Sequence, residues 1–157
     1  MAAYAINLSG QSLGQEDLLD YVKREILRSG VKPNLITFEI TETAAIRNVS
    51  HANRFMTELK KMGCQFSLDD FGSGLSSFGY LKMLPVDYLK IDGSFVLNLL
   101  TDPIDRGIVE ACNGISHAAG LQTIAEFVEN QETADALKLI GVDFAQGFGI
   151  ERPGPLR

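Results

Sequence analysis

The side chains best suited to catalysis are two adjacent carboxylates, Asp69 and Asp70, which follow a short apolar strand and precede a glycine-bearing loop. Side chains alternate along a strand, so Asp69 leaves it on the face opposite Phe66 and Leu68. Carboxylates at the end of an apolar strand are costly to bury unless they are paired or bind a metal ion. Because aspartate is also common in turns and helix caps, the pair becomes informative only together with the rest of the chain.

Further polar side chains stand at or near the ends of the other predicted strands. They are Asn7, Glu39, Lys90, Glu126 and Gln146. The carboxyl ends of parallel strands meet at one face of an α/β fold, which is where barrels carry their active sites. In the first four strands the polar side chain also lies opposite the aliphatic stripe, so in a barrel these side chains would point inward together. Each of these residues alone is more readily explained as a satisfied polar strand end or helix cap. Only their occurrence in series indicates a shared site.

Several converging carboxylates and an amide oxygen would repel one another unless divalent cations lay among them. Such hard oxygen ligands suit Mg²⁺ or Mn²⁺. A cluster holding two ions has the geometry required for hydrolysis of a phosphodiester by in-line attack of water. The pattern therefore favours a metal-dependent phosphodiesterase.

Two further charged residues have candidate roles beside this cluster. Lys90, among acids, would neutralise charge, orient a water molecule or stabilise a leaving oxygen. Glu42, which follows Glu39 closely, is either an anchor for the glycine loop at residues 72–74 or simply an acid at the start of a helix. The residues themselves leave both interpretations of Glu42 open.

The elements that must position these residues alternate regularly between strand and helix. Strands are predicted over residues 4–9, 36–41, 66–69, 86–91, 122–126 and 143–146. Helices are predicted over about 15–29, 50–62 (capped by Ser50) and 76–83, and two more between Asp102 and Gly120 and between Asn130 and Gly141. This order predicts a parallel sheet with helices outside it.

Composition predicts one globular domain covering residues 1–157, with 45% hydrophobic and 22% charged residues. The net charge of −6 argues against binding of nucleic acid or of an anionic membrane. No apolar run is long enough to span a bilayer, so we expect a cytoplasmic chain or the cytoplasmic part of a membrane-anchored protein. Two isolated cysteines and two isolated histidines do not have the spacing of a zinc site.

Taken together, these motifs resemble those of EAL domains, bacterial phosphodiesterases that open cyclic di-GMP to the linear dinucleotide pGpG. The matching segments occur in the family's order with similar spacing and cover nearly the whole chain. They are Asn-Leu-Ser at 7–9, Glu-Ile-Thr-Glu at 39–42, Asp-Asp-Phe-Gly-Ser-Gly at 69–74, Lys-Ile-Asp at 90–92, Glu-Phe-Val-Glu at 126–129 and Gln-Gly at 146–147.

The resemblance implies a TIM-like barrel and a role for each matching residue. The equivalents of Asn7, Glu39, Asp69 and Asp70 would bind two Mg²⁺ or Mn²⁺ ions. Lys90 would contact the attacking water, Glu126 would assist as base or metal ligand, and Glu129 and Gln146 would lie beside the substrate. Glu42 would anchor the loop 70–77, which in this family links metal binding to dimerisation, so a homodimer is implied. Phe127 stands where a glycine is common in this motif.

The chain departs from the family at its start, because it has no Glu-Ala-Leu signature with its metal-binding Glu and nearby substrate-binding Arg. A complete eight-stranded barrel usually takes about 250 residues. We therefore expect the C-terminal portion of an EAL domain, with about six of the eight strand-helix units and without the N-terminal strands. The remainder would come from a partner chain, from self-pairing or from a longer polypeptide of the sensor or GGDEF-EAL type.

Two alternatives stay open at this point. The chain is either an enzyme or a truncated, inactive EAL-like module that binds cyclic di-GMP or mediates dimerisation. A third interpretation, independent of the resemblance, is some other metal-dependent α/β hydrolase or lyase. Hydrolysis of cyclic di-GMP separates the first interpretation from the other two.

Overall fold

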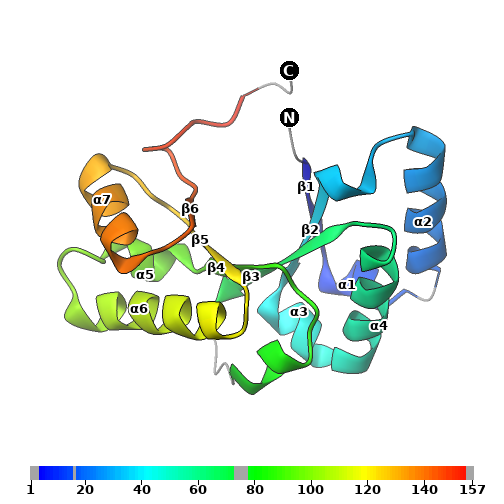
Figure 1. Cartoon of the computed structure of the whole chain (residues 1–157), viewed down its shortest axis with the longest axis horizontal. Coiled ribbons are helices and arrows are strands. Elements are labelled where there is room, and N and C mark those ends of the chain that lie inside the picture. The colour runs from blue at the N-terminus through cyan, green and yellow to red at the C-terminus, as the bar shows by residue number, and fades with distance from the viewer. Residues whose placement is uncertain (1–3, 16, 73–77, 155–157) are drawn as a thin grey trace. The chain divides into compact units, whose positions relative to one another are not determined.

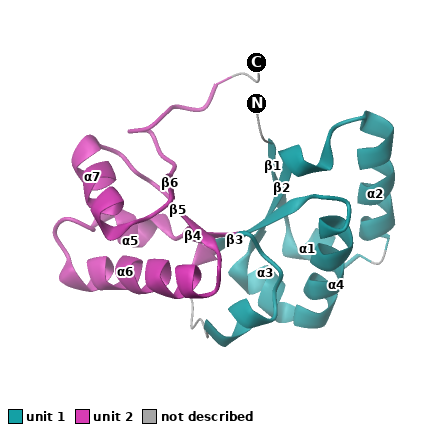
Figure 2. Cartoon of the chain, in the orientation of Figure 1, with its two compact units in different colours: residues 1–69, 77–87 teal, residues 70–76, 88–157 magenta. Residues whose placement is uncertain are grey.

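The computed structural model describes residues 4–15, 17–72 and 78–154 (Figure 1). The chain divides into two compact units, shown in teal and magenta in Figure 2. Unit 1 comprises residues 1–69 and 77–87, and unit 2 comprises residues 70–76 and 88–157. Five of the nine candidate site residues belong to unit 2, namely Asp70, Lys90, Glu126, Glu129 and Gln146.

Unit 1 contains three parallel strands, β1 (Tyr4–Leu8), β2 (Ile36–Thr41) and β3 (Gln65–Phe71), the last of which enters unit 2 after Asp69. Its helical segments are α1 (Gly10–Leu13), α2 (Leu18–Ser29), η1 (Pro33–Leu35), α3 (Glu42–Arg47), α4 (Val49–Lys60) and η2 (Phe78–Lys82). The predicted alternation of strands and helices is confirmed here, and each strand pairs with the next one along the chain.

The alternation along β2 separates an apolar face from a polar one. Ile36, Phe38 and Ile40 are buried, whereas the side chains between them are only partly covered. The ring of Phe38 stacks on Phe66 of β3 at 5.6 Å between centroids, and both rings make T-shaped contacts with Phe55 from α4. Full burial of one such side chain contributes about 1.5–3 kcal/mol. The apolar face of β2 therefore packs in the core, and the opposite face is available for polar side chains.

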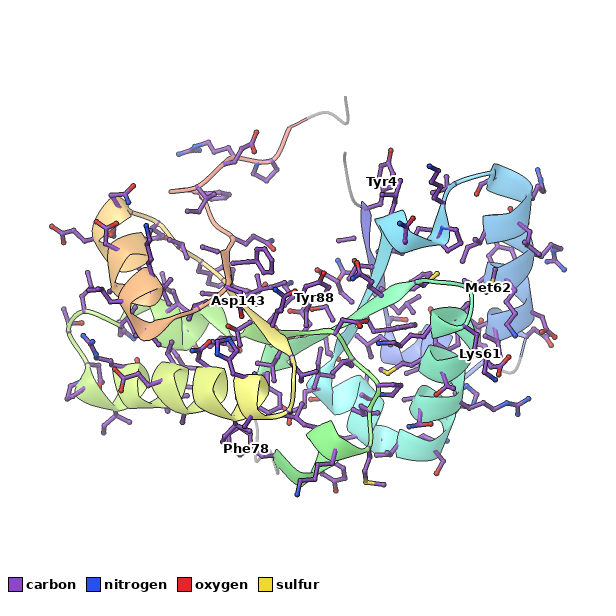
Figure 3. The ribbon with its side chains drawn as sticks, viewed as in Figure 1. Tyr4, Lys61, Met62, Phe78, Tyr88 and Asp143 are labelled. Atoms are coloured by element: carbon purple, nitrogen blue, oxygen red, sulfur yellow. The ribbon has the colours of Figure 1, made fainter. Side chains whose placement is uncertain are left out.

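The apolar side of β1 is only partly covered. Tyr4, labelled in Figure 3, is 42% exposed and Ile6 is 41% exposed. With residues of β2 and α2 such as Phe38 and Ile26, they line an open apolar cavity of about 530 Å³. The apolar side of β1 is therefore less covered than that of β2, whose Ile36, Phe38 and Ile40 are buried. In the described part of the chain β1 is the first strand in the order of the sheet and pairs with β2.

Unit 2 contains β4 (Tyr88–Ile91), β5 (Gln122–Ala125) and β6 (Phe144–Ala145), again parallel and in chain order. Its helices are α5 (Gly93–Leu97), α6 (Pro103–Ala118) and α7 (Gln131–Ile140). The end of β3 joins this unit through a hydrogen bond of 3.2 Å from the amide of Asp92 to the carbonyl of Phe71. Helix α6 packs against β4 and β5 through its buried residues Val109 and Cys112.

Two of the predicted helix caps are confirmed. Asp102 accepts a hydrogen bond of 2.7 Å from the amide of Ile104, directly after the proline that opens α6. Asn130 accepts one of 2.9 Å from the amide of Thr133 at the start of α7. Such caps stabilise a helix by about 1 kcal/mol because they satisfy amides that have no partner within it. No helix among the described residues has both the length and the apolar character needed to cross a membrane.

Other local predictions are wrong. The cap of α4 is Asn48 rather than Ser50, because α3 occupies the preceding residues and the chain turns at Asn48, which accepts a hydrogen bond of 3.0 Å from the amide of His51. The helices α1 and α5 were not expected, since each is too short to show a helical period of apolar residues. Of the predicted helix at 76–83, residues 78–82 form a 3₁₀ segment and residues 76 and 77 lie outside the described residues.

Asp143, labelled in Figure 3, connects three elements of unit 2. Its Oδ2 lies 2.7 Å from the amide nitrogen of Thr123 in β5 and 2.8 Å from Nε2 of His117 in α6. Burial by itself would raise the pKa of Asp143, but the hydrogen bonds from the Thr123 amide and the His117 ring outweigh it and lower that pKa. The charged carboxylate therefore stabilises the junction of β5, β6 and α6.

Replacement of Asp143 by asparagine should make the protein less stable in a pH-dependent manner. Because the folded pKa is lowered, the contribution of Asp143 is complete above the ordinary aspartate pKa of about 3.9 and is lost as the pH falls through the lower folded value. We expect Asp143→Asn to lose about 1–3 kcal/mol at pH 7. Urea unfolding of both proteins between pH 7 and pH 3 should show this difference shrinking in acid.

The control for this prediction is Asp135→Asn, an identical change at an exposed position of α7. It should follow the wild type at every pH. A difference between Asp143→Asn and wild type that stays constant down to pH 3 would contradict the charge-based explanation.

Candidate active site

Unit 1 brings three of the predicted metal ligands to one face at the ends of adjacent strands. Asn7 pairs in register with Glu39, and Glu39 pairs with Ser67, so these residues share one side of the sheet. Asp69, two positions after Ser67, lies on that same side. Unit 1 thus offers one amide and two carboxylate side chains where β1, β2 and β3 end.

Glu42 is the first residue of α3 and is only 5% exposed. The helix begins directly at the end of β2, where the hydroxyl of Thr41 accepts a hydrogen bond of 3.3 Å from the amide of Ala44. An acid in the first turn also interacts favourably with the helix dipole. This placement fits a helix-start acid, while residues 73–77 of the loop that Glu42 was expected to anchor lie outside the described residues.

A buried ion pair occupies the strand ends of unit 2. Nζ of Lys90 lies 2.8 Å from Oε1 of Glu126, with 3% and 13% of the two side chains exposed. The register of β4 and β5 pairs Lys90 with Ile124, which brings Glu126, two residues later, beside the ammonium group. A buried lysine needs such a partner, because an unpaired buried charge is strongly unfavourable.

Asp70 adds a second carboxylate to this ion pair. Its oxygen lies within 4.8 Å of a carboxylate oxygen of Glu126, close enough for one cation to touch both. Two acids at this separation repel, and Lys90 neutralises only one of their charges. Carboxylate oxygens are the ligands that Mg²⁺ and Mn²⁺ prefer, so the donor set of unit 2 fits such an ion.

The backbone of Asp70 departs from strand geometry, with φ of +56°. This left-handed conformation is uncommon for residues other than glycine, although aspartate tolerates it better than most. The departure breaks the alternation of side chains, so Asp70 is exposed while its neighbours Asp69 and Phe71 are not. Because of its left-handed backbone, the Asp70 carboxylate does not lie on the side of the sheet that strict alternation would give it.

Glu126, Glu129 and Gln146 come together around one cavity of about 420 Å³ in unit 2. Its lining also includes Leu97, Phe127, Gly147, Phe148, Glu151 and Pro153. Backbone hydrogen bonds fix this wall: the amide of Gln146 donates to the carbonyl of Ala125 at 2.8 Å, and the carbonyl of Gln146 accepts from the amide of Val128 at 3.0 Å. The cavity is thus built on the ends of β5 and β6.

Sequence reasoning missed Phe127, Phe148 and Ser67 as site residues. Each aromatic residue stands one or two positions after a predicted polar strand end, and that proximity was the available signal. Ser67 shares the strand face of Asp69, is fully buried, and makes no hydrogen bond through its hydroxyl to the described residues. A buried hydroxyl of this kind costs about 1–3 kcal/mol, which makes Ser67 unusual among core residues.

Comparison with known proteins gives a consistent result. A family model described as EAL domain matches residues 1–153. The cyclic di-GMP phosphodiesterase PdeB of Shewanella oneidensis is 47% identical over 152 residues, covering 97% of this chain and 18% of that protein. The bifunctional diguanylate cyclase/cyclic di-GMP phosphodiesterase MucR of Pseudomonas aeruginosa is 36% identical over 151 residues, covering 96% of this chain and 22% of that protein.

A solved structure of the PaMucR phosphodiesterase in complex with c-di-GMP superposes on this chain with a TM-score of 0.92 at 36% identity. The match covers 98% of this chain and 62% of that one. The predicted fold class, a TIM-like α/β barrel represented by about six strand-helix units, is thereby confirmed. This chain spans about a fifth of the length of the curated relatives that it matches.

The ion pair of Lys90 and Glu126 should be important for stability. Lys90→Met leaves Glu126 without this partner at a site with 13% exposure, so we expect a loss of about 3–5 kcal/mol. The double variant Lys90→Met/Glu126→Gln should lose less than the sum of the two single changes, because it leaves no buried charge of the pair behind. Urea unfolding at pH 7 measures all three.

Lys138→Met, at an exposed position of α7, is the matched control and should change stability by less than about 0.5 kcal/mol. Strictly additive effects of the two single changes would show that the pair does not couple in the folded protein.

Proposed function

The chain belongs to the EAL domain family, and on that premise we propose that it is part of a metal-dependent phosphodiesterase that hydrolyses cyclic di-GMP to linear pGpG. The observation that carries the proposal is the buried pair of Lys90 and Glu126 with the carboxylate of Asp70 within 4.8 Å. These groups stand at the strand ends of unit 2, and Glu126 also lines the cavity there.

The proposed metal ligands are Asn7, Glu39, Asp69 and Asp70, with Glu126 as a further ligand or as the base. Their amide and carboxylate oxygens are those that Mg²⁺ and Mn²⁺ take. Ions held by these residues would supply Lewis-acid chemistry for the phosphodiester and for the attacking water. They would also attract the anionic diester to a chain whose net charge is −6.

Lys90 and Glu126 would both contact the attacking water, and each would have a different role. The ammonium group, held at 2.8 Å from the carboxylate, donates hydrogen bonds only and so fixes the orientation of an oxygen placed beside it. The carboxylate accepts a proton and is the group suited to act as the general base. The Lys90 side chain is only 3% exposed, so the packing around it holds it in one position before the substrate binds.

Glu129 and Gln146 are proposed to contact the substrate, since both line the cavity that Glu126 borders. Glu42 is proposed to anchor the loop 70–77 and to link metal binding with formation of a homodimer. We further propose that this chain works within a longer polypeptide, because it spans about a fifth of relatives that include a bifunctional cyclase and phosphodiesterase.

A second candidate is a module that binds cyclic di-GMP or mediates dimerisation without catalysis. The Glu-Ala-Leu signature, with its metal-binding Glu, is not among these 157 residues, and hydrolysis measured on them tests whether the remaining ligands suffice. The presence of Asp70, Lys90 and Glu126 favours the enzyme.

Hydrolysis of cyclic di-GMP by residues 1–157 in Mg²⁺ and in Mn²⁺ separates the two candidates. The product pGpG is detected by chromatography. We expect the wild type to hydrolyse cyclic di-GMP. In Asp70→Asn the turnover rate should fall about 100-fold or more, because loss of a group that only supports a metal ligand already costs about 10- to 100-fold. Asp135→Asn, the exposed control on α7, should retain full activity.

Binding of cyclic di-GMP without turnover by the folded wild type would overturn the enzymatic proposal and support the binding module. If the folded wild type neither binds nor hydrolyses cyclic di-GMP, both the enzyme and the cyclic di-GMP-binding module are overturned, and only the dimerisation module remains. Equal activity in Asp70→Asn and Asp135→Asn would show that Asp70 is not a ligand.

Metal binding should also stabilise the fold. When the free concentration of an ion is 100 times its dissociation constant for the native state, binding adds about 2.7 kcal/mol to the free energy of unfolding. We expect MnCl₂ to raise the melting temperature of the wild type and of Asp135→Asn, and to have little effect on Asp70→Asn. Calorimetry with CaCl₂ and NaCl at matched ionic strength separates specific binding from screening, and an equal shift in all salts would contradict a metal site.

A further inference from the structure

Ser67 lies within β3 and carries a hydroxyl group that is buried without a partner. The residue is 0% exposed, and its Oγ makes no hydrogen bond to the residues that the structure describes. Other buried hydroxyls are satisfied. Oγ of Ser116 donates to the carbonyl of Cys112 at 2.7 Å, for example, and Oγ1 of Thr123 bonds to a neighbouring side chain at 2.6 Å. Burial of an unpaired polar group destabilises a protein, so the hydroxyl of Ser67 calls for an explanation.

Packing of the core does not supply this explanation. The neighbours of Ser67 along the strand, Phe66 and Leu68, are 0% and 2% exposed and point to the opposite face. They provide the apolar contacts of β3. An alanine at position 67 would fit the same strand without burying a hydroxyl group. The reason for a serine must therefore be sought on the face where its own side chain stands.

That face carries the proposed metal ligands of unit 1. Ser67 pairs in register with Glu39 of β2, and Glu39 pairs with Asn7 of β1. Asp69 follows two positions later in β3 on the same side. Adjacent strands lie about 4.8 Å apart, so the side chains of Ser67 and Glu39 leave the sheet as direct neighbours. The unpaired hydroxyl thus stands next to a carboxylate that is proposed to bind metal.

A hydroxyl group beside such a carboxylate has a defined chemical use. A carboxylate that binds an ion through one oxygen still accepts hydrogen bonds through the other. Donors of this kind orient metal-binding side chains and strengthen binding of the ion. A serine hydroxyl rotates to suit the acceptor that is present, and it donates without adding a positive charge that would compete with the cation.

We propose that Ser67 is a positioning residue whose hydroxyl donates a hydrogen bond to the Glu39 carboxylate when that carboxylate binds an ion. The inference rests on the proposed function and deepens it, because it names a residue that prepares the metal site without touching the metal. The unfavourable burial of the hydroxyl is then offset only in the metal-bound protein.

This role predicts opposite effects of Ser67→Ala on the stability of the metal-free protein and on its affinity for metal. Loss of an unpaired buried hydroxyl should raise the melting temperature in EDTA by about 2–4 °C. Loss of the hydrogen bond to Glu39 should weaken binding of Mn²⁺, measured by isothermal titration calorimetry, about 10- to 100-fold. Replacement of a serine with only a structural role would lower the melting temperature and leave the affinity unchanged.

The matched control is Ser116→Ala, the same change at a buried hydroxyl that has a partner in α6. It should lower the melting temperature of the metal-free protein, because it removes a satisfied hydrogen bond. Its affinity for Mn²⁺ should stay within about twofold of the wild type, because Ser116 lies in a helix of unit 2 and not among the proposed ligands.

Two further variants separate the hydroxyl from the size of the side chain. Ser67→Thr keeps the hydroxyl and adds a methyl group, so its affinity for Mn²⁺ should stay within about threefold of the wild type even where crowding lowers the melting temperature. Ser67→Cys has nearly the shape of serine but only a weak donor, and it should lose affinity as Ser67→Ala does. Because affinity is expected to follow the hydroxyl, misfolding of any one variant does not decide the result.

Introducing Ser67→Ala into Glu39→Ala tests whether the hydroxyl acts through Glu39. The acceptor is absent in this background, so the second change should alter the affinity for Mn²⁺ by less than about twofold. A further loss of about 10-fold or more would show that the hydroxyl acts on another group, and would overturn the role assigned to Ser67.

Unchanged affinity for Mn²⁺ in Ser67→Ala, with a wild type that binds the ion, would overturn this inference and leave the proposed function intact. A lower melting temperature of metal-free Ser67→Ala would show that the hydroxyl already has a partner, and would overturn it as well. A folded wild type that binds no Mn²⁺ would overturn both the inference and the metal dependence of the proposed function.

Discussion

The buried ion pair of Lys90 and Glu126 is the interaction on which the site depends. A lysine that is 3% exposed at the end of β4 must meet an acid, and the register of β4 with β5 delivers Glu126 at 2.8 Å. With Asp70 within 4.8 Å, the same place holds more negative than positive charge. An excess of carboxylate around one ammonium group is the electrostatic condition under which a divalent cation is held.

Strain at this site is held in place by packing elsewhere. Asp70 and Phe127 both have left-handed backbones, with φ of +56° and +54°. Asp70 supplies one carboxylate of the site, and Phe127 directly follows Glu126, which supplies another. The segment around Phe127 is kept in position by contact with Gly93 and Gly147, where any larger side chain would overlap it. Placing such conformations beside rigid strands gives a site whose geometry exists before a ligand binds.

The fold places chemistry and core on opposite faces of the same strands. In β2 the buried Phe38 and Ile40 alternate with Glu39, so the packing that stabilises unit 1 also directs the carboxylate away from the core. Unit 2 repeats the arrangement, with buried residues of β4 facing α6.

Local features of the sequence determined the order of strands and helices, the caps at Asp102 and Asn130, and the polar residues at the strand ends, because period and capping act over a few residues. They could not reveal the short helices, the cap at Asn48, the open side of β1, or the pairing of Lys90 with Glu126. Contact between Phe127 and Gly93 was equally hidden. These depend on side chains far apart in the sequence, and only the packing of strands and helices in three dimensions decides which of them meet.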